Sequence, residues 1–201
     1  MPITFKKEFI PKILSGEKTR TTRYRKHAGV KVGGTYKAKT NRFAKEHFAL
    51  LKVVAIRSAY ASADSPFRRN AWTQNLDLVI GFARQQHHAE KEGFEDYHEF
   101  RSVYTELNAH HKDDMQRKHW IIDFGVVNEN GEFIATKFRI GDWVSLTRYG
   151  ELKTAQILEV DYSEWNQDWC YKLDSFVNDT LDFWDWQMEY KIHHAVNPNI
   201  D

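Results

Sequence analysis

The chain has 201 residues, of which 41% are hydrophobic and 28% charged, a composition typical of a globular protein with a substantial core rather than of a disordered chain. Its apolar runs are too short to span a bilayer and its first residues lack the apolar stretch of a secretory signal, so we expect neither membrane insertion nor secretion. Its single cysteine, Cys170, excludes a disulfide within the chain, and we expect a cytoplasmic location.

The charge is distributed unevenly along the chain, although the formal net charge is only +1. Residues 1–57 carry 15 Lys and Arg against three acids, whereas residues 151–201 carry three Lys against 11 acids. One interpretation is that the N-terminal half faces a polyanion. The alternative is that the two oppositely charged parts pack against each other.

The N-terminal residues predict a strand, a short helix and a second strand. Residues 3–5 form the first strand, and the helix covers about residues 8–15. Pro11 suits the first turn of that helix, and Gly16 suits the left-handed residue just past its end. The Thr-rich run 18–23 then predicts an extended segment.

Two residues of this extended run are candidates for chemistry. Lys18 could act as a base for the Thr21 hydroxyl if burial or the neighbouring Arg20 and Arg23 held its amine neutral. Strand alternation places Lys18 and Thr21 on opposite faces, unless a bulge at the helix exit re-aims one of them. The plainer interpretation is a solvated basic strand.

The middle of the chain predicts two more strands and two helices. The strands cover residues 32–39 and 48–60, and a basic loop separates them. Apolar residues at three- and four-residue spacing predict helices over about 72–92 and 95–107, with Gly93 ending the first.

The C-terminal third predicts further strands and a last helix. Asn130-Gly131 is a strong hairpin signal between two apolar runs. An apolar stripe at helical spacing predicts a helix over 173–192. The predicted strands cover residues 119–127, 133–138, 139–146 and 152–160.

The end of the helix predicted over 72–92 carries other polar candidates. Glu90 and Glu92 could act as a general acid or base. His88 and Glu92, four residues apart, have a spacing that can ligate one metal ion, but no metal-binding motif accompanies them. We therefore expect neither a metal nor a cofactor.

Four blocks of the sequence resemble the ASCH domain family of the PUA-like superfamily. The first block contains a segment similar to the family signature GxKxxTxR, and the blocks occur in the family's order. The resemblance implies an α+β fold in which a mixed β-barrel is flanked by helices. It assigns residues 1–127 to the ASCH domain and leaves 128–201 as an extension of β-hairpin and helix packed on the barrel. The blocks are residues 13–23, 88–94, 103–104 and 120–124.

The family resemblance implies an enzymatic activity. One branch of the family comprises small amidohydrolases that remove the acetyl group from N4-acetylcytidine. Carried over by motif, Lys18 is the base, Thr21 the nucleophile and Glu92 the proton donor and acceptor. Arg23 is the signature arginine, which shapes the pocket or holds an anion.

The alternative function is binding without catalysis. Other relatives in the family bind RNA or other nucleic acids, and such a module would contact phosphates through basic side chains. Both interpretations stay open, with a modified nucleoside or RNA as the expected partner and no membrane. The candidate contacts to phosphate are Arg20, Arg23, Arg25, Lys26 and Arg42.

Overall fold

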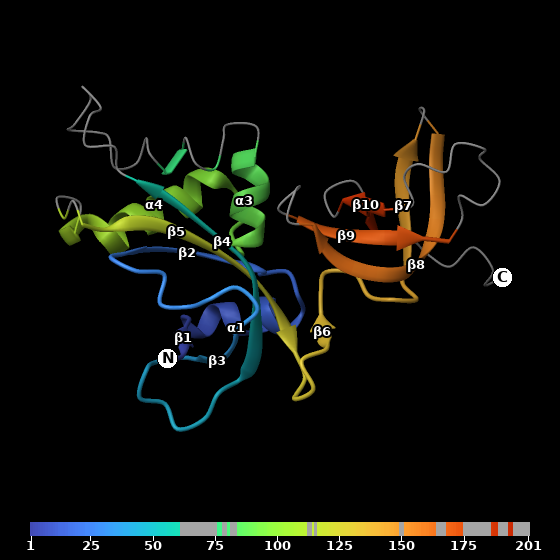
Figure 1. The fold of residues 1–201 in the computed structure, drawn as a ribbon. Coiled ribbons are helices and arrows are strands. Elements are labelled where there is room, and N and C mark those ends of the chain that lie inside the picture. The colour runs from blue at the N-terminus through green and yellow to red at the C-terminus, as the bar shows by residue number, and fades with distance from the viewer. Residues whose placement is uncertain are drawn as a thin grey trace. The chain divides into compact units, whose positions relative to one another are not determined.

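The computed structural model describes residues 1–60, 76–77, 80, 84–111, 114, 116–148, 151–163, 168–174, 186–188 and 193–194. The chain has mixed α and β structure and divides into two units, Met1–Thr136 and Lys137–Asp201 (Figure 1). The first unit ends later than the expected boundary at residue 127. The reason is that the hairpin around Asn130-Gly131 folds back onto the preceding strand.

The first unit is built on a mixed sheet with six strands among the described residues. These are β1 (Ile3–Thr4), β2 (Arg20–Arg25), β3 (Thr35–Lys39), β4 (Ala49–Tyr60), β5 (Lys118–Val127) and β6 (Phe133–Ala135). Their spatial order is β1-β3-β4-β5-β2, and β6 pairs with β5 off this path. β1 is parallel to β3, and the other pairs are antiparallel.

Helices lie on both faces of this sheet (Figure 1). They are η1 (Lys7–Phe9), α1 (Ile10–Leu14), α3 (Gln85–Lys91), α4 (Tyr97–Asn108) and η3 (Ala109–His111). Ile121 of β5 packs with Phe100 of α4, whereas Ile122 packs with Ile13 of α1, because successive strand residues point to opposite faces. Of the helix predicted over 72–92, α3 is the main described part, and residues 72–75, 78–79 and 81–83 lie outside the described residues.

The sheet does not close into a barrel within the described residues, contrary to the expectation. β1 and β2 are its two edges and do not pair with each other. β1 is only two residues long, and the chain turns into η1 before it could form a ladder with β2. A side chain bridges the gap instead, because Arg23 Nη2 donates to the Thr4 carbonyl oxygen at 2.5 Å.

The second unit consists of strands in its described part. They are β7 (Trp143–Arg148), β8 (Glu151–Ser163), β9 (Asp168–Leu173), β10 (Trp186–Met188) and β11 (His193–His194), in the order β10-β9-β8-β7-β11. The helix predicted over 173–192 is therefore wrong at Leu173 and at Trp186–Met188, which belong to strands, and residues 175–185 and 189–192 lie outside the described residues. Leu173 and Met188, the described members of the apolar stripe, lie on two different strands, and apolar spacing alone does not exclude strands.

Candidate functional site

The turn after α1 positions Lys18. Gly16 ends the helix with a φ of +82°, the left-handed conformation expected from the sequence. The Lys18 N–H then donates to the Lys12 carbonyl oxygen at 2.8 Å. β2 begins only at Arg20, so Lys18 is outside the strand alternation that would have separated it from Thr21.

The turn after α3 positions Glu92. Gly93 has a φ of +82°, and the Phe94 N–H donates to the Ala89 carbonyl oxygen at 2.9 Å, which together form a Schellman motif. Glu92 is the last residue before this left-handed turn. Gly93 therefore ends the helix, as the sequence predicts.

Lys18 and Glu92 form a buried ion pair. Lys18 Nζ donates to Glu92 Oε2 at 2.9 Å and also to the backbone carbonyl oxygen of Glu92. The two residues are only 2% and 4% exposed. A backbone bond from the Thr19 N–H to the Lys91 carbonyl oxygen, at 3.1 Å, holds the two segments together.

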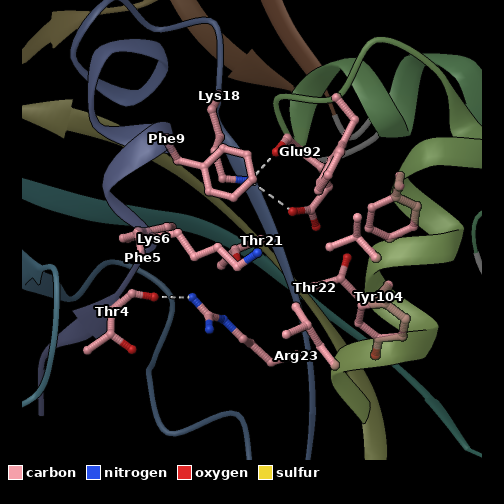
Figure 2. A pocket seen from close by; sticks show the side chains of 14 residues that line it. Thr4, Phe5, Lys6, Phe9, Lys18, Thr21, Thr22, Arg23, Glu92 and Tyr104 are labelled. Atoms are coloured by element: carbon pink, nitrogen blue, oxygen red, sulfur yellow. Dashed lines mark hydrogen bonds and ion pairs between the residues drawn. The ribbon is translucent and has the colours of Figure 1, made fainter. Parts of the chain in front are cut away.

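Both members of the pair line a cavity of about 110 Å³ together with Thr21 (Figure 2). The three residues assigned to catalysis by the family resemblance therefore share one cavity. Thr21 is buried, and its hydroxyl forms no hydrogen bond with another described residue. Arg23 and Lys6 also line the cavity and bring two more cations to its wall.

Aromatic rings form another part of the cavity wall. The ring centroids of Phe9 and Phe94 are 5.5 Å apart, those of Phe94 and Phe100 5.6 Å, and those of Phe100 and Tyr104 5.6 Å. Such a row of rings offers apolar surface to a planar ligand.

The surroundings of Lys18 lower the pKa of its amine below the ordinary value for lysine. Burial is the main cause that lowers the pKa of Lys18, and the charges of Arg23 and Lys12 lower it further against the opposing effect of Glu92. Burial and the nearby Arg25 also lower the pKa of Arg23, to about 10. The direction of the shift at Lys18 is the one that a general base requires.

Arg20 takes part in a buried ionic network instead of facing solvent. Its Nε is 2.5 Å from Asp123 Oδ1, and Arg57 Nη2 is 2.9 Å from Asp123 Oδ2. Burial would raise the pKa of Asp123, but the two arginines outweigh it and hold this pKa below its usual range. The expected role of Arg20 as a phosphate contact does not fit this placement, because its charge is already directed at Asp123.

His88 connects this network to Glu92. Its Nδ1 is 3.3 Å from Arg20 Nη1, and since arginine only donates, Nδ1 accepts and the ring proton is on Nε2. Nε2 then donates to Thr22 Oγ1 at 3.2 Å and lies 3.9 Å from Glu92 Oε1, which forms no hydrogen bond within the described residues. Burial and Arg20 lower the pKa of His88, in agreement with a neutral ring.

The remaining basic candidates do not line this cavity. Lys26 is exposed and donates to Gln116 Oε1 at 2.5 Å, and Arg25 lines a second, smaller cavity. Arg42 is exposed and its guanidinium lies 5.0 Å from the ring centroid of Phe43. These cations are thus spread over different surfaces of the unit.

Sequence reasoning missed Asp123 and the aromatic wall. Asp123 carried a usable signal, because it is an acid within the apolar run 119–127 that predicts a buried strand. The aromatic wall gave no signal in the sequence, because its residues belong to separate segments: η1, α4 and the loop before α4.

No family model, curated protein or solved structure matches this chain. Within the described residues, no helix is long and apolar enough to cross a membrane, and no group of three or more metal-ligating side chains occurs.

Proposed function

We propose that this protein is an amidohydrolase acting on an acylated pyrimidine nucleoside of the N4-acetylcytidine type. The observation that carries the proposal is the shared cavity of Lys18, Thr21 and Glu92. An amine, a hydroxyl and a carboxyl group are the set required for covalent catalysis at an amide. The aromatic wall suits the planar base.

The first step forms an acyl-enzyme. The neutral Lys18 amine takes the proton of the Thr21 hydroxyl, and the oxygen attacks the amide carbonyl carbon. The resulting oxyanion is stabilised by the positive charge that lines the cavity. The proton then passes from Lys18 to Glu92 across their 2.9 Å contact.

The second half of the reaction releases both products. Glu92 gives its proton to the departing amine as the carbon–nitrogen bond breaks, which leaves the acyl group on Thr21. Glu92 next takes a proton from water, and the hydroxide attacks the ester. The proton returns through Lys18 to the Thr21 oxygen as the carboxylic acid leaves, so one water is consumed for each amide cleaved.

We further propose that the first unit is an ASCH-type domain of the PUA-like class. Three features support this assignment. The signature-like segment 13–23 runs from α1 into β2, the end of α3 meets it at Glu92, and β5 pairs with β2. The open edge between β1 and β2 departs from a closed barrel.

The experiment is a direct assay of the purified full chain with N4-acetylcytidine, in which cytidine and acetate are quantified by chromatography. Thr21→Val preserves the shape of the side chain and removes the nucleophile, so we expect a loss of at least about a thousandfold in rate. Thr35→Val, at an exposed position of β3, is the matched control and should retain full activity. A wild-type protein inert toward a panel of acylated nucleosides and their 5′-monophosphates would contradict the proposal.

A second candidate function, binding of single-stranded nucleic acid, is favoured by one surface feature. Phe43 is 82% exposed and stacks against the exposed Arg42, which is an arrangement that binds unpaired bases. If this surface binds RNA, Phe43→Ala and Arg42→Gln should each weaken binding to a single-stranded oligonucleotide in a fluorescence anisotropy titration. Arg42→Gln should also reduce the salt dependence. Identical titrations for wild type and both variants would exclude this surface.

A further inference from the structure

The charges that line the cavity do not balance. Three cations, Lys6, Lys18 and Arg23, face one carboxylate, that of Glu92. Lys18 already pairs with Glu92 at 2.9 Å. Two positive charges on the cavity wall therefore have no carboxylate partner within the cavity.

Arg23 forms no ion pair with a described residue. One hydrogen bond holds its guanidinium, from Nη2 to the Thr4 carbonyl oxygen, and the group also lies 5.5 Å from the ring centroid of Phe5. Because a guanidinium has five N–H donors, most of them are left for a ligand. With a pKa of about 10, the side chain stays charged at neutral pH in spite of its burial.

Lys6 supplies the second positive charge. Its side chain is half exposed, and its ion pair with Glu8, at 3.6 Å, lies in solvent, where such pairs contribute little. In Figure 2, Lys6 extends from the η1 side and Arg23 from β2 toward the space between β1 and β2. A guanidinium beside an ammonium is a common arrangement for binding carboxylate or phosphate.

We propose that the ligand of this cavity is a small ring compound that carries an anionic group, a phosphate or a carboxylate, and that Arg23 and Lys6 bind this group. The aromatic wall takes the ring, and the two cations take the charge. The consequence for the substrate rests on the proposed function: if the enzyme cleaves acylated pyrimidines, its substrate is the acylated nucleotide, or another acylated ring anion, in preference to the neutral nucleoside.

The test compares matched neutral and anionic ligands by isothermal titration calorimetry on the full chain at low salt. The pairs are cytidine with cytidine 5′-monophosphate and benzyl alcohol with benzoate. None of these ligands contains the amide bond, so the result does not depend on catalysis. In at least one pair, we expect the anion to bind about tenfold tighter than its neutral partner. A difference of this size is what one charge-assisted hydrogen bond contributes to affinity.

Three variants assign the preference to residues. Arg23→Gln and Lys6→Gln should each reduce the preference for the anionic ligand severalfold. Arg23→Lys should retain part of this preference, because the positive charge stays but the parallel N–H donors of the guanidinium are lost. Lys7→Gln removes the same charge from an exposed neighbour that does not line the cavity, and it should change nothing. If Arg23→Gln fails to fold, the exposed Lys6→Gln still carries the test.

Each outcome decides the proposal. Equal affinities within both pairs, or no binding of any of the four ligands, would overturn it. An anion preference that survives Arg23→Gln and Lys6→Gln would overturn the assignment to these residues. The pair that shows the preference distinguishes phosphate from carboxylate. An anion preference without hydrolysis of N4-acetylcytidine or its 5′-monophosphate would refute the proposed function and leave this inference standing.

Discussion

Lys18 Nζ lies 2.9 Å from Glu92 Oε2 inside the first unit, although the two residues are 74 positions apart in the chain. The pair joins the segment after α1 to the end of α3. Both of these segments turn at a glycine with a positive φ, Gly16 and Gly93. The position of the candidate catalytic groups therefore depends on two helix ends and on the charge that each group offers the other.

Removing one member of this pair should destabilise the protein more than removing both. Lys18→Met leaves the Glu92 carboxylate buried without its cation, which costs about 3–5 kcal/mol of unfolding free energy. In the double variant Lys18→Met/Glu92→Leu no uncompensated charge remains, so much of this loss should be recovered. Urea unfolding at neutral pH measures the difference, with Lys7→Met at an exposed position as control. Additive losses from the two single variants would show that the pair is not coupled.

The pH dependence of activity should report the lowered pKa of Lys18. The general base is the neutral amine, so kcat/KM should rise with pH and level off below the ordinary lysine pKa of about 10.4. The charge of Lys12 is one of the causes that lower this pKa. Lys12→Gln should therefore move the alkaline midpoint of the pH–rate profile upward. An unchanged midpoint would mean that another group sets the profile.

The neutral His88 should make the first unit sensitive to mild acid. Its pKa is lowered in the folded state, so below about pH 6.5 the unfolded chain binds a proton that the folded protein does not. As the pH falls below this value, the free energy of unfolding decreases by about 1.4 kcal/mol per pH unit. The decrease stops once the pH reaches the lowered pKa of His88 in the folded protein. Urea unfolding across this range should show a steeper acid loss for the wild type than for His88→Gln. Parallel curves would contradict the assignment of a neutral ring.

Alanine substitutions at two glycines with the same φ distinguish the cost of backbone strain from the cost of a steric clash. Gly16 and Gly131 both have a φ of +82°, so alanine is strained at either position. A Cβ at Gly131 would meet no atom within 4 Å, whereas at Gly16 it would lie 2.4 Å from the Thr136 carbonyl carbon. Gly131→Ala should therefore cost about 1 kcal/mol. Gly16→Ala should cost several kcal/mol more, because Thr136 must move; equal losses in thermal unfolding would contradict this packing.

Much of the local structure could be predicted because it depends on short-range chemistry. Gly16 and Gly93 end their helices as expected, Asn130-Gly131 connects β5 and β6, and the helix predicted over 95–107 is α4, Tyr97–Asn108. These signals act within a few residues of the chain. They need no knowledge of the tertiary fold.

The site could be predicted only in part. Strand alternation alone placed Lys18 and Thr21 on opposite faces, and only the family resemblance grouped them with Glu92. The burial of Arg20 could not be predicted, because its partner Asp123 is 103 positions away and a basic residue on a polar strand gives no local sign of burial. Long-range ionic partners of this kind follow from strand pairing, here that of β2 with β5.

The bridge from Arg23 to the Thr4 carbonyl also has a practical consequence for handling the protein. Thr4 and Phe5 line the large cavity, and Met1 and Pro2 line the smaller one beside Arg23, so the first five residues are part of the site's surroundings. An affinity tag fused ahead of Met1 would begin next to the smaller cavity, which Arg23 also lines. Assays of this protein should therefore compare tagged and protease-trimmed preparations before weak binding is attributed to the molecule itself.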